Sequence, residues 1–188
     1  PLSPLPMPDY EGRRIILEHP TAVQSSLRLG CPLVDRTHPD FAALKVLVTV
    51  LGGYFGSRLM SNIREEKGYT YGINASIASF PFQGYLAIGT ETDNEYVEPC
   101  IREVKYEMRR LQEELIPEQE LSMVKNYMIG EMCRNYEDPF SLSDAWIFVK
   151  TAGLENNFFQ TLAEKIRRVK AEELRDLAFR YFQSENMI

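Results

Sequence analysis

The stretch LGGYFGSRLMSNIREEKGYTY, residues 51–71, predicts a unit of helix end, short helix and strand. Its glycine pair, Gly52 and Gly53, is expected to end a preceding helix, because glycine accepts the left-handed conformation found past a helix C-terminus. A short helix is predicted from Ser57 to Lys67, with Gly68 as its stop. Tyr71 then begins a strand. The inward side chains of the short helix are Leu59, Met60 and Ile63.

The residues before this stretch predict two strands and a helix. Arg13 to Leu17 are expected to form a short strand. From Val23 to Leu29, inward residues alternate with the polar Gln24, Ser26 and Arg28, which is the pattern of a half-buried strand. Thr37 is expected to cap the helix, with Pro39 in its first turn. The apolar face of this helix consists of Phe41, Leu44, Leu47, Val48 and Leu51.

The residues after the stretch predict a hairpin followed by helices. Residues 80–84 turn between two strands, the first from Tyr71 and the second from Tyr85 to Thr92. One face of the first strand is expected to carry Tyr71, Ile73, Ala75 and Ile77. Apolar residues at helical spacing then predict helices over 97–115, 117–132, 139–153, 162–169 and 174–181.

This order of elements predicts an α+β fold. Runs of strands that alternate with runs of helices are typical of a two-layer domain with a mainly antiparallel sheet, covered by helices on one face. Four prolines within residues 1–8 favour extended structure and a linker over residues 1–12. The domain is then expected over 13–188. A hydrophobic segment that begins within 184–188 predicts that the domain is cut before its last strand.

Composition restricts the classes of partner. The net charge of −6 argues against nucleic acid, which needs a basic patch. No apolar run reaches the roughly 18 residues of a membrane span. The three cysteines, Cys31, Cys100 and Cys133, have no disulfide or metal-pair spacing and are expected to be buried thiols. The sequence does not indicate the compartment.

The sequence predicts no metal site and no nucleophile within the chain. Its two histidines, His19 and His38, are far apart and each precedes a proline, and His-x-x-Glu-His and its inverse are absent. No Gly-x-Ser-x-Gly elbow occurs. The Gly52–Ser57 segment lacks the Gly-Lys-Ser/Thr ending of a phosphate loop, so a tight turn between helices is the better interpretation. Adjacent glutamates, as at Glu65 and Glu66, are expected on solvated helix faces.

The stretch 51–71 resembles the peptidase M16 family, specifically its C-terminal-type domain. The family pattern is Leu-Gly-Gly, then Ser-Arg-Leu, then Leu-Arg-Glu-x-x-Gly-x-x-Tyr. Ser57-Arg58-Leu59 and Ile63-Arg64-Glu65 through Gly68 and Tyr71 match it in order. Further matches are Gln24, Gly84 and the segment Ile116 to Leu121. The resemblance spans about Arg13 to Ile188.

The resemblance implies a division of labour between two similar halves that close around a peptide. The other, N-terminal half is expected to hold Zn²⁺ and the general base, and this chain to supply Arg64 and Tyr71 as substrate-binding residues. A tyrosine hydroxyl can donate to the oxyanion that develops during attack on a peptide carbonyl, so Tyr71 is the candidate catalytic residue. Arginine presents a charged fork to carbonyl or carboxylate oxygens. Ser57 and Arg58 are interpreted as structural, with an ion pair between the halves.

Two alternatives stay open. Arg64 could instead form a salt bridge on the helix surface and Tyr71 pack at a strand edge, since surface ion pairs are common. The family also contains non-catalytic subunits that present peptides or scaffold a complex, and an unrelated α+β ligand-binding module is a third hypothesis. The isolated chain is expected to cleave no peptide and, through apolar surface left by the absent half, to self-associate.

Overall fold

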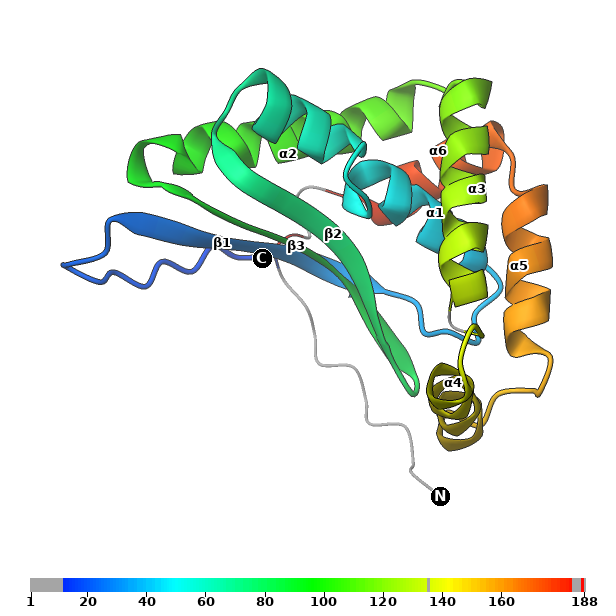
Figure 1. The fold of residues 1–188 in the computed structure, drawn as a ribbon. Helices are drawn as coiled ribbons and strands as arrows, with labels where there is room; N and C mark the ends of the chain where they lie inside the picture. Colours follow the sequence, from blue (N-terminus) through cyan, green and yellow to red (C-terminus); the bar gives the residue numbers. More distant parts are fainter. Residues whose placement is uncertain (1–11, 135, 184–186, 188) are drawn as a thin grey trace.

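A computed structural model describes residues 12–134, 136–183 and 187. Within them, three strands form one antiparallel sheet in the order β1-β3-β2 (Figure 1). The strands are β1 (Gln24–Leu33), β2 (Thr70–Phe80) and β3 (Gln83–Asp93). The helices are α1 (Phe41–Gly52), the π-helix η1 (Met60–Glu66), the 3-10 helix η2 (Asn94–Tyr96), α2 (Val97–Glu113), α3 (Glu118–Arg134), α4 (Pro139–Thr151), α5 (Phe158–Arg168) and α6 (Ala171–Tyr181).

The helices cover one face of the sheet and leave the other face open. Leu29, Ile88 and Ala75 are register partners across the three strands and are all buried beneath the helices. The next row, Gly30, Ala87 and Ser76, points to the opposite face. The predicted α+β fold with a helix layer on one face is therefore confirmed.

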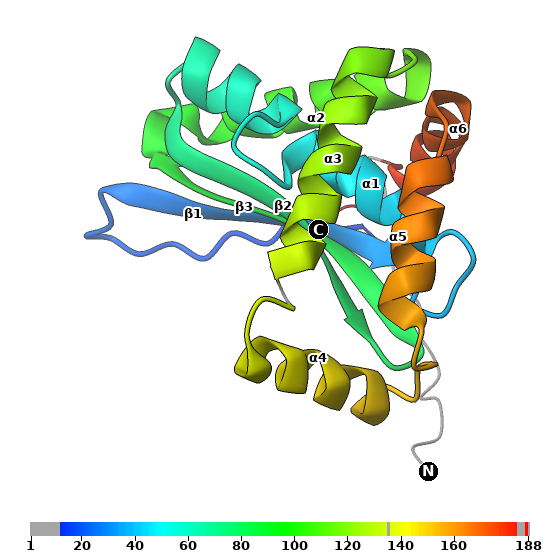
Figure 2. The ribbon, with the colours of Figure 1, turned by 45° about the vertical axis from the view of Figure 1, so that its right-hand side comes forward.

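α4 is the exception among the helices. It stands beside the hairpin end of the sheet and not over its buried face (Figures 1 and 2). Val149 is its one buried residue. Asp138 caps it by accepting hydrogen bonds from the backbone N–H groups of Phe140 and Ser141 at 2.8 and 3.0 Å, and Pro139 occupies the first turn.

The predicted hairpin is confirmed, with a tighter turn than expected. β2 runs to Phe80 and β3 begins at Gln83, so two residues, Pro81 and Phe82, connect the strands. Phe82 has a φ of 74°, and after Pro81 this is the position at which a type II turn requires the left-handed region. The helix stop at Gly68 is also confirmed, with a φ of 66°.

Two predictions before α1 are wrong. Arg13 to Leu17 form no strand, because they pair with none of the described strands and β1 pairs only with β3. Thr37 does not cap α1. Its backbone N–H and its hydroxyl both donate to Asp35, at 2.7 and 2.6 Å, which closes a turn, and α1 starts only after Asp40.

Two smaller corrections concern side chains near helix ends, and the predictions for the two ends of the chain stay predictions. Cys31 and Cys100 are buried as expected, but Cys133 is exposed near the end of α3. Leu115 lies beyond the end of α2 and is exposed. The expected linker, residues 1–12, lies outside the described residues except for Gly12, as does the expected strand stub at 184–188 except for Met187.

Candidate functional site

The short helix η1 is the platform of the candidate site. Leu59, Met60 and Ile63 are buried against the core, as their spacing predicts. The predicted short helix is present, and over Met60–Glu66 it is a π-helix. π-helical turns are rare and are found frequently at functional sites.

Side chains fix η1 to the two neighbouring long helices. Arg58, just before η1, makes a bidentate ion pair with Glu120 of α3, at 2.9 Å from Nε and 3.0 Å from one terminal nitrogen. On the other side, the Asn62 amide donates to Glu107 of α2 at 2.7 Å, and that carboxylate is only 2% exposed. Arg58 therefore has a structural role, as predicted, but its ion pair lies within this domain and not between two halves.

Arg64 lies against the start of β2. Its Nε donates to the backbone oxygen of Tyr71 at 2.9 Å, and its guanidinium lies 4.7 Å from the centre of the Phe55 ring. Its one ion pair among the described residues is a long one, 3.8 Å, to the adjacent Glu65. The side chain is 35% exposed. Arg64 is thus held by a backbone oxygen and an aromatic ring, with charge left facing solvent.

Tyr71 is almost fully exposed, at 95%. The register of β2 against β3 shifts between Thr70 and Ile73, and this irregularity turns Tyr71 out of the sheet. The prediction that Tyr71 shares the face of Ile73 and Ala75 is therefore wrong. The alternative in which Tyr71 packs at a strand edge also fails, because a side chain this exposed is packed against nothing.

Arg64 and Tyr71 border the same hollow. Its volume is about 610 Å³, and it lies where η1, β2 and the end of β3 meet. Three carboxylates, Glu65, Glu91 and Asp93, complete its rim. A hydrogen bond from Arg28, and to a smaller extent one from Ser26, holds the pKa of the Glu91 carboxyl below its ordinary value. The hollow is thus lined by groups of both signs together with tyrosine rings.

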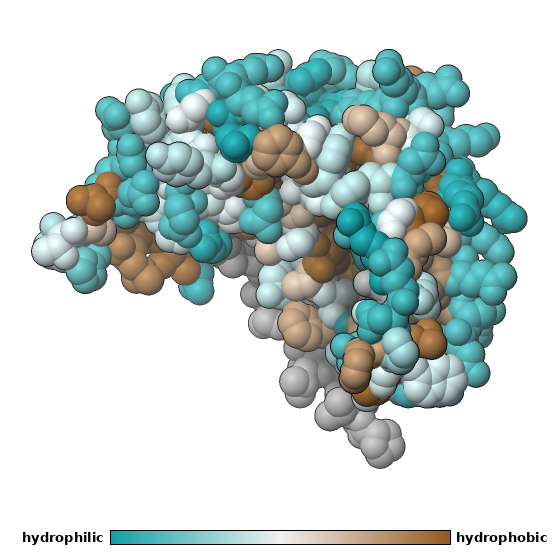
Figure 3. All heavy atoms as spheres, viewed as in Figure 1, coloured by the Kyte–Doolittle hydropathy of each residue, from teal (hydrophilic) through white to brown (hydrophobic). Residues whose placement is uncertain are grey.

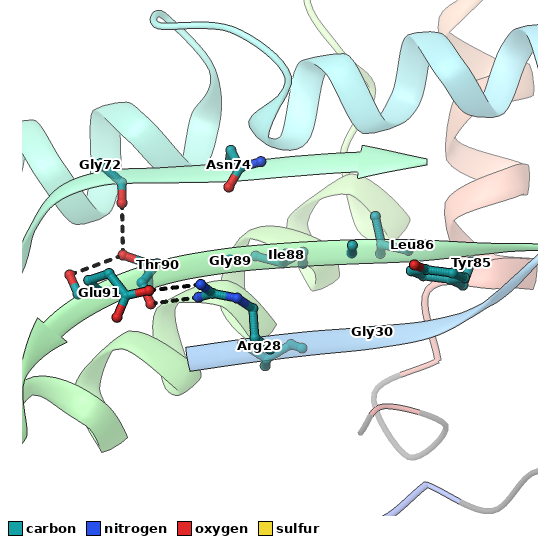
Figure 4. Close-up of a pocket in the computed structure, with 12 residues that line it drawn as sticks. Arg28, Gly30, Gly72, Asn74, Tyr85, Leu86, Ile88, Gly89, Thr90 and Glu91 are labelled. Atoms are coloured by element: carbon teal, nitrogen blue, oxygen red, sulfur yellow. Dashed lines mark hydrogen bonds and ion pairs between the residues drawn. The ribbon is translucent and has the colours of Figure 1, made fainter. Parts of the chain in front are cut away.

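A second hollow lies on the open face of the sheet (Figure 4). Its volume is about 630 Å³, and small residues such as Gly30, Gly72 and Gly89 leave room for it. Arg28 crosses from β1 to bond Glu91 of β3 at 2.8 Å, and Glu91 belongs to the rim of both hollows. The sequence analysis missed this surface, although the small side chains at alternate positions of β1 and β3 were the available signal.

The described ranges contain no group of three or more His, Cys, Asp or Glu residues that could hold a metal ion. His19 and His38 instead have local hydrogen bonds. A ring nitrogen of His19 lies 3.1 Å from the Thr21 hydroxyl, and the ring of His38 accepts from the backbone N–H of Asp40 at 3.1 Å. These described residues therefore do not fit a zinc centre. No helix in the described part of the chain has the length and apolarity to cross a bilayer.

The match that decides the family covers the whole of the candidate site. The peptidase M16 inactive domain matches residues 1–128 of the chain. The chain belongs to the peptidase M16 family. It is therefore an M16 domain of the C-terminal, inactive type, as the pattern in residues 51–71 indicated.

Relatives of this M16 domain carry different names. It is 31% identical to the "Non-peptidase homolog YmxG" of Helicobacter pylori over 159 residues, which cover 81% of this chain and 36% of that protein. It is 27% identical to the "Uncharacterized zinc protease YmxG" of Bacillus subtilis, over 71% of this chain and 32% of that protein. The chain thus spans about a third of the length of these curated relatives.

Solved structures support the same fold. The crystal structure of a peptidase M16 inactive domain from Pseudomonas fluorescens superposes with a TM-score of 0.79 at 23% identity, covering 88% of this chain and 40% of that one. At this level of identity the likeness establishes the fold alone.

Proposed function

We propose that this M16 domain is the substrate-side part of a zinc-dependent endopeptidase. Arg64 and Tyr71 contact the peptide, and zinc is held by another half of the protein or by a partner subunit. The observation that carries the proposal is the pairing of the two side chains on one rim. Arg64 is fixed by the Tyr71 backbone oxygen at 2.9 Å, while the Tyr71 ring is free in solvent.

The two side chains have distinct roles in this proposal. The Arg64 fork binds a carbonyl or carboxylate oxygen of the peptide. The Tyr71 hydroxyl donates a hydrogen bond to the carbonyl oxygen of the scissile bond as negative charge develops there. The hollow of the open sheet face, which shares Glu91 with this rim, gives an extended peptide a continuous surface beyond the reacting bond.

Replacing Tyr71 by Phe in the full-length protein tests the catalytic role. The change leaves the Arg64 hydrogen bond intact, because that bond ends on the backbone oxygen. We expect kcat for peptide hydrolysis to fall by about 100-fold, as for loss of one oxyanion donor. Tyr106→Phe, at a half-exposed position on α2, is the matched control and should keep full activity. Unchanged turnover in Tyr71→Phe would refute the role of the hydroxyl.

A non-catalytic function is the second candidate, because one relative is named a non-peptidase homolog. In that case the same hollow binds peptides without cleaving them. The zinc content of the purified full-length protein and the presence of His-x-x-Glu-His in its other half discriminate the two candidates. A zinc-free full-length protein that binds peptides and hydrolyses none would favour the second.

A further inference from the structure

A third cavity lies towards the hairpin end of β2, away from Arg64 and Tyr71. Its volume is about 420 Å³, and it is enclosed by α1, the 75–79 part of β2, α4 and α5. This volume lies within the range of pockets for small ligands, roughly 300–1,000 Å³. The two basic side chains that line it are Arg36 and Lys45.

Phenylalanine rings form one wall of the cavity. The ring centre of Phe148 in α4 lies 5.9 Å from that of Phe159 and 6.2 Å from that of Phe158. The rings of Phe158 and Phe159 meet edge to face, with their centres 5.2 Å apart. Three rings from two helices thus meet at one place. They give the cavity an apolar surface suited to a ring or a branched aliphatic group.

The two cations of the cavity lack carboxylate partners. Among the described residues neither Arg36 nor Lys45 has an acidic oxygen within 4.0 Å. Desolvation lowers the pKa of the Lys45 ammonium below its ordinary value. The Lys45 residue is nevertheless exposed on α1, so its ammonium still reaches solvent. A cation without a carboxylate beside it gains a charge-assisted hydrogen bond from an anion placed there.

Arg36 is held so that one of its donors stays unused. One terminal nitrogen donates to the Ser79 backbone oxygen, and the guanidinium lies 4.7 Å over the Phe148 ring. The Arg36 Nε and the Ser79 hydroxyl are buried, and neither has a hydrogen-bond partner among the described residues. Unpaired buried polar atoms are costly, so two of them on residues that line one cavity indicate a missing polar partner.

We propose that this cavity binds a carboxylate carried on an apolar ring or branched body. The carboxylate takes the place of the missing partner between Arg36, Ser79 and Lys45, and the body packs on the phenylalanine wall. Two sources share this chemistry: a free arylcarboxylic acid, and the carboxyl end of a peptide that finishes on a hydrophobic residue. The site is separate from the proposed peptidase function and does not depend on it.

The test is a calorimetric and NMR titration of the chain with four probes. The probes are 3-phenylpropionate, N-acetylphenylalanine, the neutral 3-phenylpropionamide and inorganic phosphate. Both carboxylates should bind saturably and shift amide resonances around 75–79 and 148–159. The neutral amide should bind at least about 10-fold more weakly, the scale of a lost hydrogen bond to a charged group. Phosphate, which lacks an apolar body, should also be weaker.

Variants connect the binding to the two cations. Lys45→Met and Arg36→Lys should each weaken the binding of 3-phenylpropionate by about 10-fold. Lys105→Met, which replaces an exposed lysine on α2, should leave this affinity unchanged. Tighter binding of N-acetylphenylalanine than of 3-phenylpropionate assigns a peptide terminus, and the reverse order assigns a free acid. Equal binding of the amide and the acid, no saturable binding, or full affinity in Lys45→Met would each overturn the proposal.

Discussion

Arg58 shows how one side chain can fix the geometry of the proposed site without contacting substrate. Its side chain is 10% exposed, and both of its bonds to Glu120 join the start of η1 to α3. Removing one partner of such a pair leaves a charge without compensation in a desolvated place. Glu120 keeps some exposure, so the loss should fall at or below the lower end of the range known for buried pairs.

We therefore expect Arg58→Ala to lower the free energy of unfolding by about 2–3 kcal/mol, measured by urea denaturation of the chain. Arg134→Ala is the matched control, because Arg134 forms an ion pair with Glu131 in which both side chains are largely exposed. Exposed pairs contribute roughly 0–1 kcal/mol. An equal loss in both variants would contradict the role assigned to the Arg58 pair.

At the same scale, sequence reasoning found the candidate residues but not their conformation. The resemblance of residues 51–71 to the M16 pattern singled out Arg64 and Tyr71, and their role stays a prediction. The exposure of Tyr71 depends on an irregular register between Thr70 and Ile73, and side-chain periodicity carries no record of such an irregularity. The hydrogen bond from Arg64 to the Tyr71 backbone oxygen could not be predicted either, because every residue carries a backbone oxygen and the sequence does not mark which one accepts.

At the scale of elements, patterns were reliable where the partner of a segment is close in sequence. The hairpin of β2 and β3 has its alternation and its turn within 24 residues, from Thr70 to Asp93, and it was predicted. Arg13 to Leu17 end in a run of three apolar residues, but a strand forms only where it pairs with a neighbouring strand. No described strand pairs with this segment, so it is irregular, and Ile16 and Leu17 are exposed.

The turn between α1 and η1 gives a second prediction, at Gly52. A Cβ atom there would lie 2.7 Å from the Ala75 Cβ and 2.8 Å from the Ala75 backbone nitrogen. Gly52 thus allows the end of α1 to approach β2 closely. Gly52→Ala must push the helix away from the strand, and we expect it to destabilise the chain by about 2 kcal/mol, as overpacking does.

Gly130→Ala is the control for that substitution. Gly130 lies on the exposed side of α3, and a Cβ there meets nothing within 4 Å. Alanine in an exposed helix should stabilise by roughly 0.5–1 kcal/mol relative to glycine. The midpoint of thermal or urea unfolding should therefore fall in Gly52→Ala and rise in Gly130→Ala. A neutral Gly52→Ala would show that the contact between α1 and β2 can relax.

At the scale of the whole molecule, two large surfaces are not covered by any other described element. One is the open face of the sheet, and the other is α4, which buries only Val149 (Figures 1 and 2). Apolar side chains gather over α4 and α5 in the surface view, at the lower right, and along the segment 12–23, at the left (Figure 3). Exposed apolar patches of this kind are typical of interaction surfaces.

The exposed apolar side chains of α4 give the last prediction. Phe140, Leu142, Trp146 and Ile147 are 83, 51, 51 and 53% exposed, respectively. Because burying such groups against one another removes them from water, the isolated chain should self-associate as its concentration rises. Light scattering coupled to gel filtration should show a molar mass above the 21.7 kDa of one chain.

Two substitutions locate the contact that drives this association. The double variant Phe140→Ser and Ile147→Lys should return the chain to a monomer, because it removes two of the four apolar groups and adds a charge. Phe179→Ser on α6 is the control, since Phe179 is 68% exposed but lies on another helix. If the control abolishes association as well as the double variant does, α4 is not the contact. If the unaltered chain is monomeric at every concentration, its exposed apolar groups are too dispersed to bind one another.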